Sequence, residues 1–141
     1  MTALRDYVLF DRAGDVPEQV WRDPQLVVEK FMPERDPRGF ALRTWCFMGR
    51  RETCSCCISA DPVVKGAAVI ARELVAVPEE LRHVRTRLGF DYGKFDFVLH
   101  DGRPILFDAN FTPTVPENLS EELSLSAKEL ARGLLEMIEL R

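Results

Sequence analysis

Hydrophobic and polar residues alternate with a period of two over residues 94–110, on both sides of Asp101-Gly102. Such alternation is typical of strands with one buried face, so this segment predicts a β-hairpin. Its apolar face carries Phe95, Phe97, Leu99, Ile105, Phe107 and Ala109. Its other face carries the polar side chains of Lys94, Asp96, Asp108 and Asn110.

The length of the turn decides whether these polar side chains meet. A two-residue turn at Asp101-Gly102 would place Phe95 opposite Asp108, which mixes the apolar and polar sets. A three-residue loop with a left-handed Gly102 and a bulge keeps the two apolar sets on one face. Because a slip of one residue turns every side chain over, the hydrophobic pattern favours the three-residue loop. We therefore expect Asp96 and Asp108 to be directly or diagonally opposed.

The rest of the pattern predicts hairpin-linked strands and a few helices. Strands are expected at residues 7–10, 26–32, 40–48 and 52–59. A helical turn is expected at residues 17–21, and a helix at residues 79–88 with Leu81, Val84 and Leu88 in the core. A last helix is expected after an N-cap at Ser120 or Ser124. Its apolar stripe consists of Ala127, Leu130, Leu134, Met137 and Ile138. Residues 67–77 fit either helix or strand. Consecutive strands of this kind indicate an α+β fold with an antiparallel sheet and flanking helices.

Composition limits the class of protein. The chain has 141 residues, 46% of them hydrophobic, which suffices for one domain with a core. The net charge is −4, with acids and bases mixed throughout, so we expect no binding to nucleic acid. The first residues lack the apolar run of a signal peptide, and no segment is long enough to span a membrane. We therefore expect a cytoplasmic protein.

The polar face of the hairpin is the strongest candidate for chemistry. Two carboxylates at close range repel each other unless a cation lies between them or one takes up a proton. Oxygen ligands without His or Cys suit Mg²⁺ or Mn²⁺. The pattern alone leaves open a second interpretation, a solvated strand face on which Lys94 balances Asp96 and Asp108.

Lys94-Phe95-Asp96, followed by Leu106-Phe107-Asp108-Ala109-Asn110-Phe111-Thr112-Pro113, resembles the metal-binding end of ATP-grasp enzymes. The resemblance implies that Asp96, Asp108 and Asn110 bind Mg²⁺ ions that hold the phosphates of ATP. It also implies that Lys94 lies near the phosphates or the acyl-phosphate intermediate. The family often has Glu at the position of Asp108.

A second resemblance lies upstream, where Leu26-Val27-Val28-Glu29-Lys30-Phe31-Met32 is similar to the hinge strand of the same family. The resemblance implies adenine contacts from the Glu29 side chain or carbonyl and from the backbone of the residues that follow. It also implies an acid that binds ribose, and the spacing does not choose between Glu34 and Asp36. The implied nucleotide-binding residues are Glu29, Lys30, Phe31, Met32, Glu34 and Asp36.

The resemblance covers residues 26–114. Residues 1–25 would then join two lobes, and residues 115–141 would form a C-terminal helix. A preceding lobe with a glycine-rich phosphate loop has no counterpart here, so we expect a truncated or split protein that is not catalytically competent alone. The implied chemistry is ATP-dependent carboxylate–amine or carboxylate–thiol ligation, with ATP and an unidentified small carboxylate as ligands.

The sequence also supports a hypothesis of another class, a non-catalytic interaction module that pairs with a partner chain or a second copy supplying the missing lobe. A third hypothesis is a zinc protein built on Cys46, Cys54, Cys56 and Cys57. On a strand, Cys54 and Cys56 would face one way and Cys57 the other, which opposes zinc. Buried hydrophobic cysteines are the simpler interpretation.

Arg43 is a further candidate catalytic residue, with two interpretations left open. Its guanidinium could reach a phosphate or a substrate carboxylate across the sheet. Alternatively, its stem packs along Trp45 with the head in water.

Overall fold

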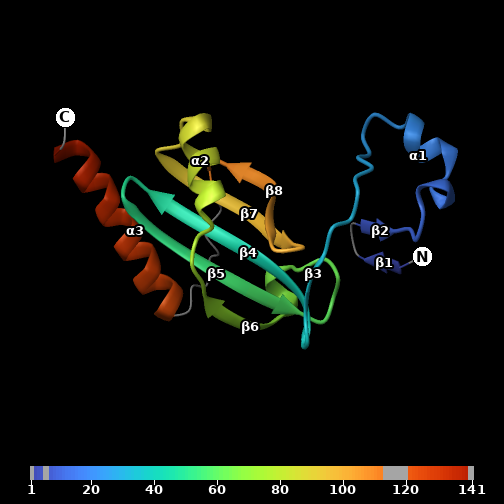
Figure 1. The fold of residues 1–141 in the computed structure, drawn as a ribbon, viewed down its shortest axis with the longest axis horizontal. Coiled ribbons are helices and arrows are strands. Elements are labelled where there is room, and N and C mark those ends of the chain that lie inside the picture. The colour runs from blue at the N-terminus through green and yellow to red at the C-terminus, as the bar shows by residue number, and fades with distance from the viewer. Residues whose placement is uncertain (1, 5–6, 113–120, 140–141) are drawn as a thin grey trace. The chain divides into compact units, whose positions relative to one another are not determined.

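The computed structural model describes residues 2–4, 7–112 and 121–139 (Figure 1). The chain divides into two compact units, Met1–Met32 and Pro33–Arg141. The first unit consists of β1 (Thr2–Leu4), β2 (Tyr7–Leu9), the 3-10 turn η1 (Ala13–Asp15) and α1 (Glu18–Arg22). Its two strands pair antiparallel. The strand expected at residues 7–10 and the helical turn expected at 17–21 are thus both present, with shifted ends.

The second unit contains the whole of a six-stranded sheet, separate from the two-stranded sheet of the first unit. Its elements are β3 (Glu34–Asp36), β4 (Gly39–Met48), β5 (Arg51–Ser59), η2 (Gly66–Ala68), β6 (Val69–Leu74), α2 (Glu79–Leu88), β7 (Tyr92–His100), β8 (Arg103–Asn110) and α3 (Glu121–Glu139). The strand order is β6-β5-β4-β7-β8, with β3 paired to β4, and neighbours are antiparallel. The predicted α+β class with an antiparallel sheet is confirmed. Residues 67–77, which fit either helix or strand, contain β6.

The core lies between the sheet and α2. Trp45 and Phe95 are fully buried, and their rings meet edge to face with centroids 5.6 Å apart. From α2, Leu81 is buried in the same cluster with Val84 beside it. Leu88, also predicted as core, is instead exposed, because α2 ends at the left-handed Gly89 and the chain turns back. The buried Phe90 packs into the cluster after this turn.

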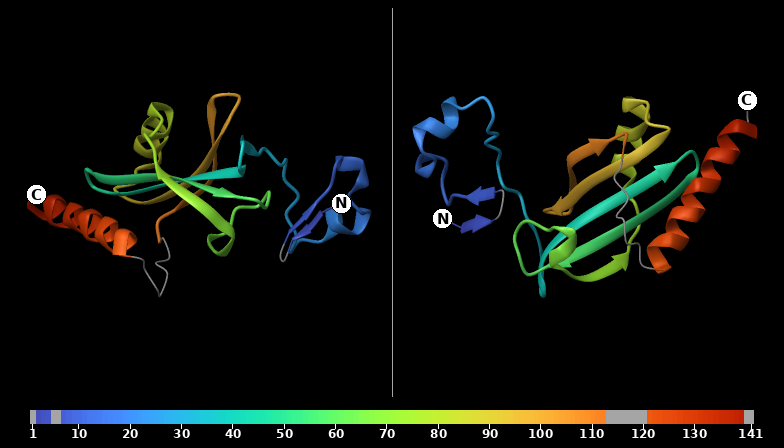
Figure 2. Two further views of the ribbon diagram at one scale, coloured as in Figure 1. Left: turned by 90° about the horizontal axis from the view of Figure 1, so that it is seen from below. Right: turned by 180° about the vertical axis from the view of Figure 1, so that it is seen from behind.

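The two long helices cover opposite faces of the sheet (Figure 2). α3 lies close to the β4–β5 turn, where a Cβ built on Gly133 would be 2.0 Å from the carbonyl oxygen of Met48. Leu134 and Ile138, predicted to face the core, are mostly exposed. The helix approaches the sheet on its Gly133 and Met137 side instead. Ser124 lies inside α3 and is not its cap, and Ser120 falls outside the described residues.

The β7–β8 hairpin differs from the expected register in an informative way. His100 pairs with Arg103, so the turn has two residues, Asp101 and Gly102, with φ values of 51° and 76°. The predicted three-residue loop is therefore wrong, because Asp-Gly suits the tight turn that matches strand twist. The bulge lies within β8 instead and leaves Phe107 without a partner. Beyond the bulge Asp96 faces Asp108, as predicted.

The strand expected at residues 26–32 is also wrong. These residues form no strand, and Val27 is 87% exposed. The segment has the β-branched and aromatic residues of a strand, but strand propensity reflects packing against neighbouring strands. Pro24 and Pro33 flank the segment. The first strand after it is β3, which pairs with β4.

Candidate metal and nucleotide site

Four polar side chains share one face of the β7–β8 hairpin. In the antiparallel register Lys94 pairs with Asn110, and Asp96 pairs with Asp108. Paired residues point to the same face, and so do alternate residues of one strand. We refer to Lys94, Asp96, Asp108 and Asn110 as the polar strip. The sequence predicted all four members and their common face.

Strand β4 adds two residues beside the polar strip. Thr44 pairs with Asp96, and Cys46 pairs with Lys94. The Thr44 hydroxyl donates a hydrogen bond of 2.8 Å to Oδ1 of Asp96. The sequence did not predict Thr44 as a site residue. It shows only that Thr44 and its neighbour Trp45 point to opposite faces of a predicted strand. The pairing of β4 with β7 is what brings it to the site.

Lys94 forms an ion pair with the other oxygen of the same carboxylate. Its Nζ lies 2.6 Å from Oδ2 of Asp96, and both side chains are largely buried. Burial lowers the pKa of Lys94, but the hydrogen bond to Asp96 and the charges of Asp96 and Asp108 raise it more, so the net pKa is above its ordinary value. The ammonium is thus a resident positive charge. It satisfies the requirement that two facing carboxylates need a nearby cation.

The other two members of the polar strip differ in their surroundings. Asp108 is exposed. The Asn110 side-chain oxygen accepts hydrogen bonds from the Thr112 amide at 2.7 Å and from the Thr112 hydroxyl at 3.2 Å. These bonds form a local turn at the end of β8 and hold the amide group in place. Carboxylate and amide oxygens have more than one lone pair, so these contacts leave capacity for a further ligand.

The donor chemistry of the polar strip fits Mg²⁺. Asp96, Asp108 and Asn110 offer hard oxygen atoms from two neighbouring strands. Across the described residues, no three His, Cys, Asp or Glu side chains form a group that could hold a metal ion. A metal here would therefore depend on water or phosphate oxygens for part of its coordination. Mg²⁺ characteristically keeps waters and binds through one or two carboxylates plus substrate phosphates.

The two candidate ribose acids, Glu34 and Asp36, both lie on β3 and both bind arginine. Glu34 accepts three hydrogen bonds of 2.7–3.1 Å from the Arg43 guanidinium, and its Oε2 also accepts the Leu99 amide at 2.7 Å. Hydrogen bonds from Arg38 lower the pKa of Asp36 to about 2. The four adenine-contact candidates, Glu29, Lys30, Phe31 and Met32, end the first compact unit.

Arg43 is not part of the polar strip. Arg43 and Trp45 are two residues apart on β4 and share a face, so Arg43 projects from the face opposite to Thr44. Its hydrogen bonds to Glu34 raise the pKa of the guanidinium despite partial burial. Of the two interpretations of Arg43, neither describes its principal contact, which is a half-buried ion pair that joins β3 to β4.

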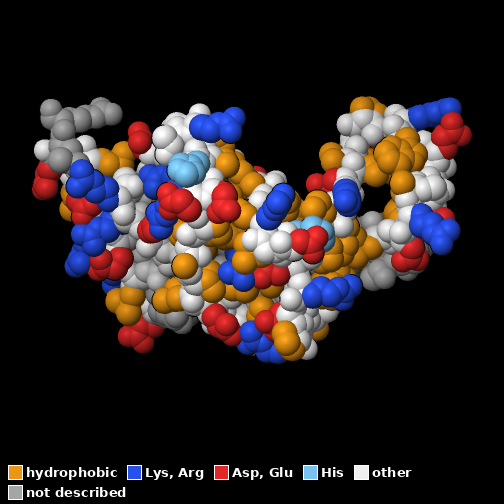
Figure 3. Space-filling model, viewed as in Figure 1, with side chains coloured by type: hydrophobic (Ala, Val, Ile, Leu, Met, Phe, Trp, Pro, Cys, Tyr) orange, Lys and Arg blue, Asp and Glu red, His pale blue; other side chains and the backbone are white. Residues whose placement is uncertain are grey.

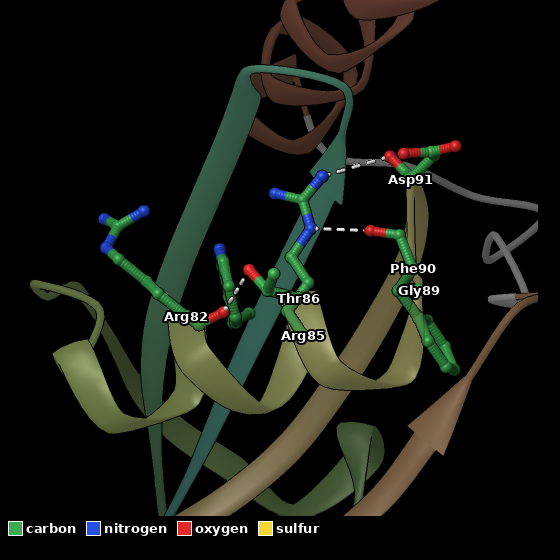
Figure 4. Close-up of a pocket in the computed structure, with 7 residues that line it drawn as sticks. Arg82, Arg85, Thr86, Gly89, Phe90 and Asp91 are labelled. Carbon is green, nitrogen blue, oxygen red and sulfur yellow. Dashed lines mark hydrogen bonds between the residues drawn. The ribbon is translucent and has the colours of Figure 1, made fainter.

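A hollow of about 300 Å³ lies beside the C-terminal end of α2 (Figure 4). Trp45 lines it, so it belongs to the face opposite the polar strip. Within it the Arg85 guanidinium donates to the carbonyl oxygens of Phe90 at 2.8 Å and Gly49 at 2.7 Å. Burial lowers the pKa of Arg85. These contacts fasten α2 to the β4–β5 turn, which is a structural role.

The cysteines support the structure rather than a metal site. All four are free thiols, and Cys54, Cys56 and Cys57 are buried. Cys54 pairs with Trp45 and Cys56 with Arg43, whereas Cys57 pairs with Leu42, so the thiols divide between the two faces as predicted. Burial raises the pKa of Cys46, Cys54 and Cys56. Thiols of this kind are poor metal ligands because the ligating form is the thiolate.

The surface gives no sign of a continuous basic stripe on the face seen in Figure 3, where acidic and basic side chains are interspersed. Within the described residues, no helix combines the length and the apolar character needed to cross a membrane.

No model of a known protein family matches the chain, and no curated protein matches it significantly.

Proposed function

We propose that this chain is the ATP- and Mg²⁺-binding half of an ATP-grasp ligase-like protein. The observation that supports the proposal most directly is the alignment of Asp96 with Asp108, beside Asn110, on one sheet face. The two acids lie on the two strands of one hairpin, and with its two-residue turn their alignment requires a bulge at Phe107. Two facing carboxylates beside an interrupted ladder are favourable when a cation lies near both, a place that the Lys94 ammonium takes here and that Mg²⁺ would share.

In this function the polar strip binds the phosphate end of the nucleotide. Asp96, Asp108 and Asn110 hold Mg²⁺, which neutralises phosphate charge when bound. Thr44 keeps Asp96 in a fixed orientation. Lys94 supplies an ammonium for the phosphates. The acyl-phosphate-forming ligation of the family also needs the lobe that supplies the phosphate loop, so the chain alone is not expected to turn over.

The adenine contacts that the sequence resemblance implies are Glu29, Lys30, Phe31 and Met32, which belong to the first compact unit. Both candidate ribose acids pair with β4 residues on the Arg43 face, which is opposite to the polar strip, and of the two Asp36 has the less committed carboxylate. Glu34 is committed to Arg43 and to the Leu99 amide in a half-buried position. Asp36 has an exposed partner, Arg38, and exposed ion pairs exchange readily because they contribute little free energy.

The proposal is tested by calorimetric titration of the purified chain with ATP, with and without Mg²⁺. We expect saturable binding that requires Mg²⁺ and is lost in Asp108→Asn. The matched control is Asp101→Asn in the same hairpin, where Asn tolerates the left-handed backbone and binding should be unchanged. If the folded chain binds no ATP at millimolar concentration, or if both variants behave like wild type, the proposal is wrong.

The alternative, an interaction module, is favoured by a different observation. Leu134, Leu135 and Ile138 of α3 are at least half exposed, although they lie close together along one helix. A cluster of exposed apolar residues is a common feature of interaction surfaces. Sedimentation velocity over a wide concentration range distinguishes this function, since self-association that Leu134→Lys abolishes would support it. A monomer at all concentrations would count against pairing with a second copy.

A further inference from the structure

We propose that Lys94 is a built-in competitor for the metal, and that it leaves Asp96 only when a phosphate group binds. Divalent metal and phosphate would then enter the polar strip together. This inference rests on the proposed function and concerns the order and coupling of the two ligands. Its starting point is that one carboxylate, Asp96, is contacted by an ammonium and a hydroxyl at the same time.

The first step concerns space and charge at Asp96. Nζ of Lys94 lies 2.6 Å from Oδ2. Mg²⁺ binds oxygen at about 2.1 Å, so an ion on Oδ2 would lie within a few ångströms of the ammonium. Two positive charges so close repel strongly in a partly buried site, where screening by water is weak. Metal and ammonium therefore compete for this oxygen.

The second step concerns the rest of the carboxylate. Oδ1 of Asp96 accepts the Thr44 hydroxyl hydrogen at 2.8 Å. This bond holds the carboxylate so that Oδ2 continues to point toward Lys94. Because Asp96 is fixed from a separate strand, β4, it does not need to rotate when the ammonium departs. Lys94 is the part that moves.

The third step concerns the place to which Lys94 moves. A lysine has a flexible stem and three donors, so its head can change partner with little rearrangement. Its side chain is 27% exposed, which leaves a route to solvent on this face. A phosphate offers the ammonium a new anionic partner and offers the metal additional oxygen ligands. Phosphate therefore favours both events, and by linkage metal must favour phosphate equally.

The test uses the whole chain and Mn²⁺ as the metal, measured by calorimetry without nucleotide. Lys94→Met keeps the stem and removes the charge. We expect it to bind Mn²⁺ more tightly than wild type, by roughly 5- to 150-fold, the usual range of such couplings. Lys94→Arg keeps the competing charge and should bind Mn²⁺ no better than wild type. Lys128→Met, on the exposed surface of α3, is the matched control and should leave the affinity unchanged.

Tripolyphosphate separates this inference from the proposed function. Titrated as its Mn²⁺ complex, it should bind wild type more tightly than Mn²⁺ alone does, and this gain should be smaller in Lys94→Met, where no ammonium opposes the metal. If wild type binds Mg²⁺ and ATP but Lys94→Met binds Mn²⁺ alone no more tightly, the competitor role is wrong while the proposed function stands. If neither protein binds Mn²⁺ with or without tripolyphosphate, the metal site itself is wrong and both fall.

Discussion

The Thr44 hydroxyl donates its hydrogen bond to Oδ1 of Asp96 across 52 positions of sequence. The contact makes β4 a supporting strand for the polar strip. Thr44→Val keeps the shape of the side chain and removes the donor. We expect the Mg²⁺-dependent affinity for ATP to fall by about 1 kcal/mol, the usual contribution of one such hydrogen bond. Calorimetry of the variant measures this loss directly.

The control for Thr44 is Thr53→Val on β5. Thr53 pairs with Cys46, so it lies on the same face without pairing with Asp96. Equal losses in both variants would show that the β-sheet, rather than the Thr44 hydrogen bond, is what ATP binding requires.

The Glu34–Arg43 pair predicts a large effect on stability. Both side chains are mostly buried, and Glu34 also accepts the Leu99 amide. Glu34→Gln would leave the guanidinium without a negative partner, at a cost of about 2 kcal/mol in the free energy of unfolding. Urea unfolding measures it. The comparison variant is Glu73→Gln, whose pair with Arg38 is exposed and should contribute less than about 1 kcal/mol. A smaller loss at Glu34 than at Glu73 would contradict the prediction.

The approach of α3 to the sheet predicts that Gly133 does not tolerate a side chain. A Cβ there would lie 2.0 Å from the Met48 carbonyl oxygen, so the helix must shift. We expect Gly133→Ala to destabilise the second unit by about 1–3 kcal/mol, as overpacking does. Gly66→Ala is the matched control, because a Cβ at Gly66 meets nothing within 4 Å. Thermal unfolding compares the two, and amide hydrogen exchange of α3 should rise only in Gly133→Ala.

The buried thiol of Cys54 predicts a loss of stability at alkaline pH. Burial raises the pKa of Cys54 from 9.0 to about 12, so the folded chain keeps this proton where the unfolded chain releases it. The unfolded state then binds fewer protons, and the free energy of unfolding falls as pH rises from about 9 toward 12. Cys54→Ala should reduce this slope, although it lowers stability at neutral pH through a cavity. An unchanged slope in urea titrations across this range would contradict the prediction.

Alternation was enough to predict both long hairpins and the four members of the polar strip. It was wrong for Ile105 and Phe107, which it placed with the core residues, because the register near the tight turn pairs Leu106 with Phe97 and packs Leu106 against the core instead. It could not predict Thr44 or the Glu34–Arg43 pair, since both depend on which strands become neighbours. It also failed at residues 26–32, where apolar composition resembles a strand but no partner strand is present. On α3, Leu134 and Ile138 matched a helical stripe, yet Gly133 sets the contact, because the smallest residue allows the closest approach.

In a regular hairpin the length of the turn sets the pairing of every residue along both strands. The unpaired Phe107 makes the pairing of Asp96 with Asp108 independent of the pairing near the turn. The tight Asp101-Gly102 turn sets the pairing near the turn, and the bulge restores the alignment of Asp96 with Asp108 farther along. A related chain with one residue fewer between the turn and the second acid would keep every carboxylate and still turn one of them to the wrong face. In a search for relatives, the number of residues between Gly102 and Asp108 is therefore as informative as the identity of the acids.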